Sequence, residues 1–512
     1  MSTTGSTEAW LQDNFGAFVA NAAYEDFAKL MASFNGFDVR ENLTSTQLAH
    51  VFFGSDVLDS PEKVSVLLRP LEDRPVADTV AFMTEFANTA SQNGITFLAN
   101  PEVRNTMFEA IFSKVQSLFA TASLSQYQDW FQDKLILWLP SINASALAAI
   151  PKTVPCGIFQ TIMAGLDSSF RHMSPESCQD VFNFAKNYLS TKSTQGGDPC
   201  AGNTRGSWGW LGTNFGSFGS LASYKDLVSI NPDFSAMDAV AGLTPTQLAD
   251  YTLASDVLRD SEKAGKILGA LNSNNIGEFL DAFNAAAEQH ALSQLPHLET
   301  RRSILGEIFC HLSGTVKLFT PEDYSVWFGP RLDLFLSSLD AQNLGFLPDD
   351  MTCDSLAAIL KALTDHHANS TFENPEDILS FIKRILRFQQ QNSGSACIQG
   401  ISTDRAWLLE FFGPLTTYGS YSDFTDLKSD FRGMDSLDLF SARALAQLST
   451  QSHSIYSSTA MVHVLQAIRE KPGPDQFLSA YLDEFNGLVL KVNAIVFGTR
   501  AHTETGCRLE AC

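Results

Sequence analysis

Long apolar runs are missing from this sequence of 512 residues. A helix that spans a bilayer needs about 18 or more consecutive apolar residues. The best candidate, residues 478–497, is interrupted by Asp483, Glu484 and Lys491. The sequence therefore predicts no direct membrane insertion.

Basic residues are also scarce. Lys and Arg number 34 against 57 Asp and Glu, which gives a formal net charge of −23, and no basic cluster is longer than the Arg301–Arg302 pair. A nucleic-acid binder needs a positive face to displace counterions from phosphates, and anionic membranes attract basic segments. Nucleic acids are therefore excluded as partners and anionic membranes are disfavoured, whereas the charge favours a basic partner.

Catalytic signatures are missing as well. The sequence contains no Gly-x-Ser-x-Gly elbow and no His-Glu-x-x-His motif. The glycine cluster between Gly206 and Gly219 is not followed by Lys-Ser/Thr, so it does not predict a phosphate loop. We therefore expect no enzymatic activity and no cofactor.

Histidines do not have the spacing of metal ligands. Two of them are adjacent in Asp365-His366-His367, where side chains on a helix diverge by about 100°, and no second ligand pair has zinc-type spacing. The other group is His290, His297 and His311. We interpret these histidines as surface residues and expect no metal.

A repeat of about 200 residues organises the chain. Segments that begin at Trp10, Trp210 and Trp407 align with offsets of 200 and 197 residues, and each continues into a Phe-Gly pair and a Tyr-x-Asp element. Trp130-Phe131 recurs once, as Trp327-Phe328. We predict tandem units at 1–200, 201–397 and 398–512, of which the last is about half a copy.

The ends of the chain carry a further expectation. Residues 1–8 have neither the basic nor the apolar segment of a signal peptide. The third copy stops about 105 residues after Trp407. We expect a fragment of a longer precursor, whose incomplete last unit is exposed and prone to self-association.

Apolar spacing is helical almost everywhere. The run 378–386 places its apolar residues on one helix face, and Val76, Val80, Met83 and Ala87 predict another. Thr44 to Gln47 has the spacing of a capping box. The sequence therefore predicts an all-α fold in which antiparallel helix pairs stack as an elongated α-solenoid.

The tryptophans at the start of each copy have two interpretations. Residues that the fold requires must recur in every unit, so Trp10, Trp210 and Trp407 are predicted to be buried anchors. The alternative is an exposed aromatic surface repeated for binding.

Eight cysteines are present, and four of them recur in register. Cys156 and Cys200 are 44 residues apart, as are Cys353 and Cys397, and this equal spacing predicts the bridges Cys156–Cys200 and Cys353–Cys397. The pairing of the others stays open; these are Cys178, Cys310, Cys507 and Cys512. A reduced cytosolic protein with free thiols is the alternative.

Three Asn-x-Ser/Thr sequences would accept glycans in an extracellular protein. They begin at Asn42, Asn143 and Asn369.

The repeated motifs resemble those of the mesothelin, stereocilin and otoancorin family, most of all its multi-repeat members in fish. The resemblance rests on Trp-Leu-x-x-Asn-Phe-Gly at Trp10 and Trp210, on Leu-Thr-Pro-Thr-Gln-Leu-Ala at Leu243, and on the Trp-Phe pairs. It implies an extracellular right-handed superhelix of armadillo-like helices that works in adhesion. No functional residue of the family is transferred, and neither a glycolipid attachment site nor a basic cleavage run is present.

The leading hypothesis is a non-catalytic extracellular or cell-surface adhesion or scaffold protein. It would bind a protein or glycoprotein through the concave face of the superhelix. The alternative is an intracellular helical-repeat scaffold for protein–protein assembly.

Overall fold

The computed structural model describes residues 6–54, 56–193, 200, 206–292, 295, 297–368, 370–393, 397, 401–451 and 457–506. The side chains at 193, 393 and 491–506 lie outside this description. Every regular element in these ranges is a helix, which confirms the predicted all-α class. No helix among the described residues is long and apolar enough to cross a membrane.

The chain forms two compact units, Met1–Gln247 and Leu248–Cys512, and α13 (Pro245–Ala254) contains the boundary. The helices of the first unit are α1 (Thr7–Asn14), α2 (Tyr24–Leu30), α3 (Ser45–Phe53), α4 (Pro61–Glu72), α5 (Val76–Gln92), α6 (Pro101–Val115), α7 (Leu124–Asp129), α8 (Ala144–Ala148), α9 (Cys156–Ser169), α10 (Pro175–Ser193), α11 (Gly206–Asn214) and α12 (Tyr224–Ile230). Those of the second unit are α14 (Ser261–Gly269), α15 (Ile276–Gln289), α16 (Leu298–Leu312), α17 (Pro321–Val326), α18 (Ala341–Leu344), α19 (Cys353–His367), α20 (Pro375–Ser393), α21 (Asp404–Phe411), α22 (Tyr421–Leu427), α23 (Ala442–Gln451), α24 (Ser458–Arg469) and α25 (Pro474–Gly506).

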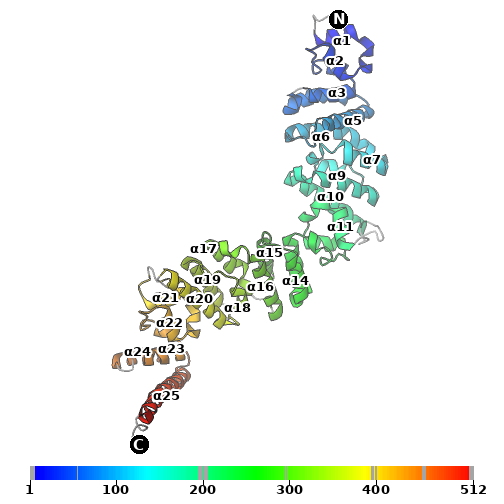
Figure 1. The fold of residues 1–512 in the computed structure, drawn as a ribbon. Coiled ribbons are helices and arrows are strands. Elements are labelled where there is room, and N and C mark those ends of the chain that lie inside the picture. The colour runs from blue at the N-terminus through cyan, green and yellow to red at the C-terminus, as the bar shows by residue number, and fades with distance from the viewer. Residues whose placement is uncertain are drawn as a thin grey trace. The chain divides into compact units, whose positions relative to one another are not determined.

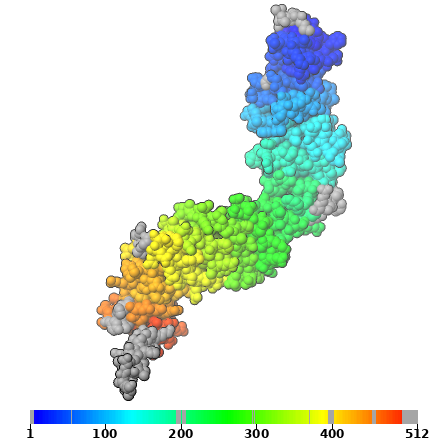
Figure 2. Space-filling view, in the orientation of Figure 1, coloured from blue at the N-terminus to red at the C-terminus, as the bar shows by residue number. Residues whose placement is uncertain are grey.

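Within each unit, a helix packs mainly on the helix two places further along the chain. In the first unit α3 contacts α5, α4 contacts α6 and α7 contacts α9; in the second, α14 contacts α16, α17 contacts α19 and α23 contacts α25 (Figure 1). Segments close in sequence are therefore close in space, as the successive colour bands inside each unit show (Figure 2). This local stacking is the arrangement of a helical solenoid.

The three copies begin with the same local structure. The helices α1, α11 and α21 are each followed, after one phenylalanine, by a glycine with positive φ, namely Gly16 at 51°, Gly216 at 55° and Gly413 at 49°. Only glycine adopts this backbone region without strain, which explains the Phe-Gly pair. A short 3₁₀ turn follows each glycine and leads into the helix that begins with the repeated tyrosine.

The repeated tryptophans are buried, as predicted. Trp10, Trp210 and Trp407 expose 2%, 3% and 0% of their surface. Each packs against two phenylalanine rings at equivalent positions, in the first copy Phe15 at 5.7 Å and Phe34 at 6.0 Å between ring centroids. These aromatic clusters form the start of the core in each copy.

The predicted capping box at the start of α3 is present and also ties two helices together. The Thr44 hydroxyl accepts a hydrogen bond from the Gln47 N–H, while the Gln47 side chain accepts one from the Thr44 N–H. Gln47 also donates through Nε2 to the carbonyls of Val19 and Ala22, at 2.8 Å each. A single glutamine therefore both caps α3 and holds the preceding turn.

Close packing of α9 depends on Gly165. The helix lies against η5 (Trp130–Lys134), a single π turn, and a Cβ placed on Gly165 would overlap the carbonyl oxygen of Phe131. The second copy has Ala362 at the equivalent position in α19. The two copies therefore differ in how closely this helix can approach the π turn.

Gly165→Ala is expected to lower the free energy of unfolding of the first unit by about 1–3 kcal/mol, because backbone atoms must move to admit the methyl group. The matched control is Gly157→Ala in the same helix, where a Cβ meets no atom within 4 Å. That substitution should stabilise by up to about 1 kcal/mol through helix propensity. Urea unfolding of both variants tests the opposite signs, and a stabilising Gly165→Ala would contradict this packing.

Candidate functional site

The four repeated cysteines form the two disulfides that their spacing predicts. Cys156, the first residue of α9, is bonded to Cys200, and Cys353, the first residue of α19, is bonded to Cys397. Each bond joins the later helices of one sequence copy to the segment that leads into the next copy. Such bonds persist in oxidising compartments.

Ion pairs repeat at the same two junctions. Lys186 on α10 bonds to Asp226 on α12 at 2.7 Å, and Lys383 on α20 bonds to Asp423 on α22 at 2.8 Å. Burial raises the pKa of both aspartates, but hydrogen bonds from the lysine and from a neighbouring serine outweigh it, so each pKa lies below its ordinary value. These carboxylates are therefore charged partners at neutral pH.

The remaining cysteines differ in environment. Cys178 is a buried thiol, and burial raises its pKa, whereas Cys310 is an exposed thiol. Cys507 and Cys512 lie outside the described residues.

The predicted glycan acceptors are also distinct. Asn42 is exposed at the end of a 3₁₀ turn. Asn143 is half-buried, and its side-chain oxygen accepts a hydrogen bond from the Ala146 N–H and so caps α8. Asn369 lies outside the described residues.

A large open groove lies in the second unit, with a volume of about 890 Å³. We call it the acidic groove. It lies between α15, the π turn η12 (Trp327–Arg331) with the residues after it, and α19. Its lining residues are Asp281, Asn284, Ala285, Glu288, Leu292, Ser325, Gly329, Pro330, Asp333, Leu334, Ala358, Lys361, Ala362, Asp365, His366 and Ser370.

Negative charge dominates the acidic groove. Four of its side chains are carboxylates. The nearby positive charges are Lys361 in the lining and the guanidinium of Arg331, which is paired with the lining residue Asp281. Arg331 is held by Asp281 through two hydrogen bonds of 2.8 Å and lies 4.7 Å from the Trp327 ring. The groove therefore carries two more negative than positive charges.

Two carboxylates of the groove are available to a ligand. Glu288 on α15 and Asp365 on α19 are exposed and form no ion pair with a described residue. Asp281 and Asp333, in contrast, bond to Arg331 and to His366. These two carboxylates lie on two different helices that line the groove.

Two buried polar atoms at the groove have no hydrogen-bond partner, and both are acceptors. Asn284 donates through Nδ2 to the carbonyls of Pro330 and Arg331, which leaves its Oδ1 unpaired. His366 bonds through Nδ1 to the Asp333 carboxylate at 2.9 Å, and its Nε2 is unpaired. Because a carboxylate only accepts, Nδ1 carries the proton and Nε2 of the neutral ring is an acceptor.

The position of His366 corrects the sequence interpretation. We expected a surface histidine, but His366 is 6% exposed and lies against the Phe372 ring. Two adjacent histidines on a helix point to different faces, and one of them can therefore be buried. Which of the two is buried depends on tertiary packing, which the sequence does not show. Among the described residues, no cluster of three or more His, Cys, Asp or Glu side chains has the geometry to hold a metal ion.

The charges of the acidic groove belong to the second copy alone. At an offset of 197 residues, its four carboxylate positions correspond to Thr84, Ser91, Ile136 and Ser168 in the first copy. Because these carboxylates do not recur between the copies, the repeat does not point to them. Their signal was the difference between two otherwise matching copies.

Comparison with protein-family models and with curated proteins finds no match to this chain.

Proposed function

We propose that this chain is a non-catalytic extracellular adhesion or scaffold protein, which binds a basic segment of a protein or glycoprotein partner in the acidic groove. The main evidence for this proposal is the set of hydrogen-bond acceptors that line the acidic groove. The free carboxylates of Glu288 and Asp365, together with the unpaired Asn284 oxygen and His366 Nε2, can accept hydrogen bonds from a ligand. Lysine and arginine side chains supply donors together with positive charge.

The global charge supports the same class of partner. A formal charge of −23 attracts basic molecules at long range, and the groove offers them a local site. Its lining residues present charged and polar side chains to a ligand. Binding is therefore a better account of this groove than bond-breaking chemistry.

The extracellular setting and the family resemblance are parts of this proposal. Two disulfides at equivalent places favour an oxidising compartment over the intracellular scaffold that was the alternative. The motifs at Trp10, Trp210 and Leu243, which resemble the mesothelin, stereocilin and otoancorin family, point to the same setting.

The double variant Glu288→Gln/Asp365→Asn is expected to weaken binding of a fluorescein-labelled Gly-Arg-Gly-Arg-Gly peptide by about tenfold, since each lost ion pair contributes about 0.5–1 kcal/mol. Fluorescence polarisation with the full chain measures this change. Raising the salt concentration from about 50 to 300 mM should weaken binding to the unmodified chain and have a smaller effect on the variant.

Glu299→Gln/Glu322→Gln is the matched control, because it removes the same charge from exposed sites of the second unit outside the groove. Its effect should stay below about twofold. Equal loss in both variants would show that net charge and not the groove attracts the peptide.

A further inference from the structure

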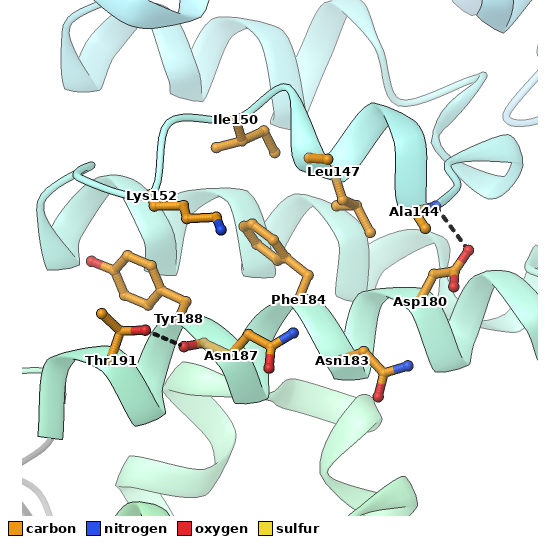
Figure 3. Close-up of a pocket in the computed structure, with 11 residues that line it drawn as sticks. Ala144, Leu147, Ile150, Lys152, Asp180, Asn183, Phe184, Asn187, Tyr188 and Thr191 are labelled. Atoms are coloured by element: carbon orange, nitrogen blue, oxygen red, sulfur yellow. Dashed lines mark hydrogen bonds between the residues drawn. The ribbon is translucent and has the colours of Figure 1, made fainter. Parts of the chain in front are cut away.

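A second cavity lies in the first unit, between α8, the loop after it and α10. Its volume is about 360 Å³, and its lining is mostly apolar. Leu147 and Ile150 form one wall, while Phe184 and Tyr188 project from one face of α10 (Figure 3). We call it the α8–α10 pocket. The size is at the lower end of the roughly 300–1,000 Å³ of ligand sites.

The second copy contains the same pocket, filled by its own arginine. Arg384 on α20 lies 5.6 Å from the ring of Phe381, the counterpart of Phe184. Its Nη2 donates to the carbonyls of Leu344 at 2.9 Å and Leu347 at 3.4 Å. Asp349 holds the guanidinium at 2.9 Å. This covering arginine leaves Phe381 only 3% exposed.

The first copy has neither member of that pair. Asn187 replaces the arginine and Lys152 replaces the aspartate, at the same offset of 197 residues. The side chain of Asn187 is too short to cover the ring, and Phe184 is half-buried where Phe381 is buried. The pocket is therefore open in the first copy because its internal occupant is absent.

The exchange also reverses the charge at the rim. Lys152 is exposed, forms no ion pair with a described residue, and points from the loop toward Phe184 (Figure 3). Asp180, the one carboxylate of the lining, accepts a hydrogen bond from the Ala144 N–H at 2.8 Å. The amides of Asn183 and Asn187, which both donate and accept, line the exposed side along α10.

We propose that the α8–α10 pocket is a second binding site, which takes an apolar side chain and an adjacent carboxylate from a peptide segment of a protein partner. The apolar side chain covers Phe184 at the place where the guanidinium of Arg384 lies over Phe381 in the second copy. The carboxylate pairs with Lys152, and the two asparagines bond to the peptide backbone. The α8–α10 pocket would prefer an acidic peptide, whereas the acidic groove would prefer a basic one. The two proposals can therefore be tested independently.

The probes are acetyl-Gly-Phe-Glu-Gly-amide and two relatives, in which Ala replaces Phe or Gln replaces Glu. Saturation-transfer NMR with the full chain measures their dissociation constants. Loss of the ring should weaken binding at least about tenfold, and loss of the carboxylate about two- to fivefold. Equal binding of all three peptides would overturn the proposal.

The sequence itself supplies the decisive variants. Lys152→Asp with Asn187→Arg installs the ion pair of the second copy, and it should reduce binding of the Phe-Glu peptide at least about tenfold. Both residues are exposed, so the fold should survive, and an unchanged circular dichroism spectrum checks this. Unchanged binding by a folded variant would refute the site.

Two further variants separate charge from shape. Lys152→Met should abolish the preference for Glu over Gln while preserving the dependence on Phe. Asp349→Lys with Arg384→Asn opens the pocket of the second copy and should add a second equivalent site for the peptide. A preference for Glu that survives in Lys152→Met would contradict the assigned role of the lysine.

Discussion

Cys156→Ser together with Cys200→Ser is expected to lower the free energy of unfolding around α9 and α11 by about 4 kcal/mol. The bond closes a loop of 44 residues, and opening it returns the corresponding chain entropy to the unfolded state. The bond also fixes the segment whose Cys200 carbonyl accepts a hydrogen bond from the Trp210 indole at 2.8 Å. Hydrogen exchange measured by mass spectrometry on the full chain resolves this region from the rest.

The second disulfide provides the control for the first. Cys353→Ser with Cys397→Ser opens a loop of the same length, 44 residues, in the second unit. It should therefore increase exchange around α19 and α21 and leave α9 and α11 unchanged. A dithiothreitol-treated sample should reproduce both effects together. A loss below about 1 kcal/mol on removing Cys156–Cys200 would mean that the unfolded chain is already restricted there.

Trp210→Ala is expected to cost about 3–5 kcal/mol, because it removes a buried indole and leaves a cavity. The side chain is 3% exposed and packs on Phe215 and Phe234. The matched control, Trp208→Ala in the same helix, removes a side chain that is 54% exposed and should cost less than about 1 kcal/mol. Urea unfolding followed by circular dichroism measures both variants.

Replacement by phenylalanine separates packing from hydrogen bonding. The Trp210 indole N–H donates to the Cys200 carbonyl, whereas that of Trp10 is buried without a partner. Trp210→Phe should therefore cost about 1 kcal/mol more than Trp10→Phe. Equal destabilisation by the two substitutions would show that the hydrogen bond from Trp210 to the Cys200 carbonyl contributes nothing to stability.

Repetition explains why much of the fold could be predicted. A tryptophan, a Phe-Gly pair and two cysteines that return at the same spacing must serve the backbone, and they proved to be a buried anchor, a positive-φ turn and a disulfide. Comparing the copies within one chain identifies the residues that all copies share and disregards the residues that only one copy has. The helical class followed from apolar spacing alone.

Helix orientation was harder to predict where several apolar faces compete. In α5 the predicted face of Val76, Val80, Met83 and Ala87 is only partly correct, because Met83 is buried while the other three are half-buried. Phe82 and Phe86 fill the core instead. Their rings contact Phe52 of α3 at 5.6 and 5.5 Å, a tertiary neighbour that the local sequence does not reveal.

The acidic groove could not be found by the same method, for a physical reason. Its carboxylates lie on α15, on the segment after η12 and on α19, between 281 and 365 in the sequence, and only packing brings them to one cavity. In a chain with 57 acidic residues, four of them carry no distinguishing signal. A residue-by-residue comparison of the copies shows which residues differ, including Lys152 and Asn187, but not that they line one cavity.

The two copy junctions have an evolutionary consequence. Each is joined by a disulfide and a lysine–aspartate pair, with members at equivalent positions 197 residues apart. Unequal crossing-over between equivalent points would add or delete one whole copy. Every cysteine and every charged residue at the new junction would then still meet the partner that it needs. Crossing-over between non-equivalent points would leave a thiol and a half-buried charge without partners. Selection therefore permits arrays of different length but favours steps of one complete copy.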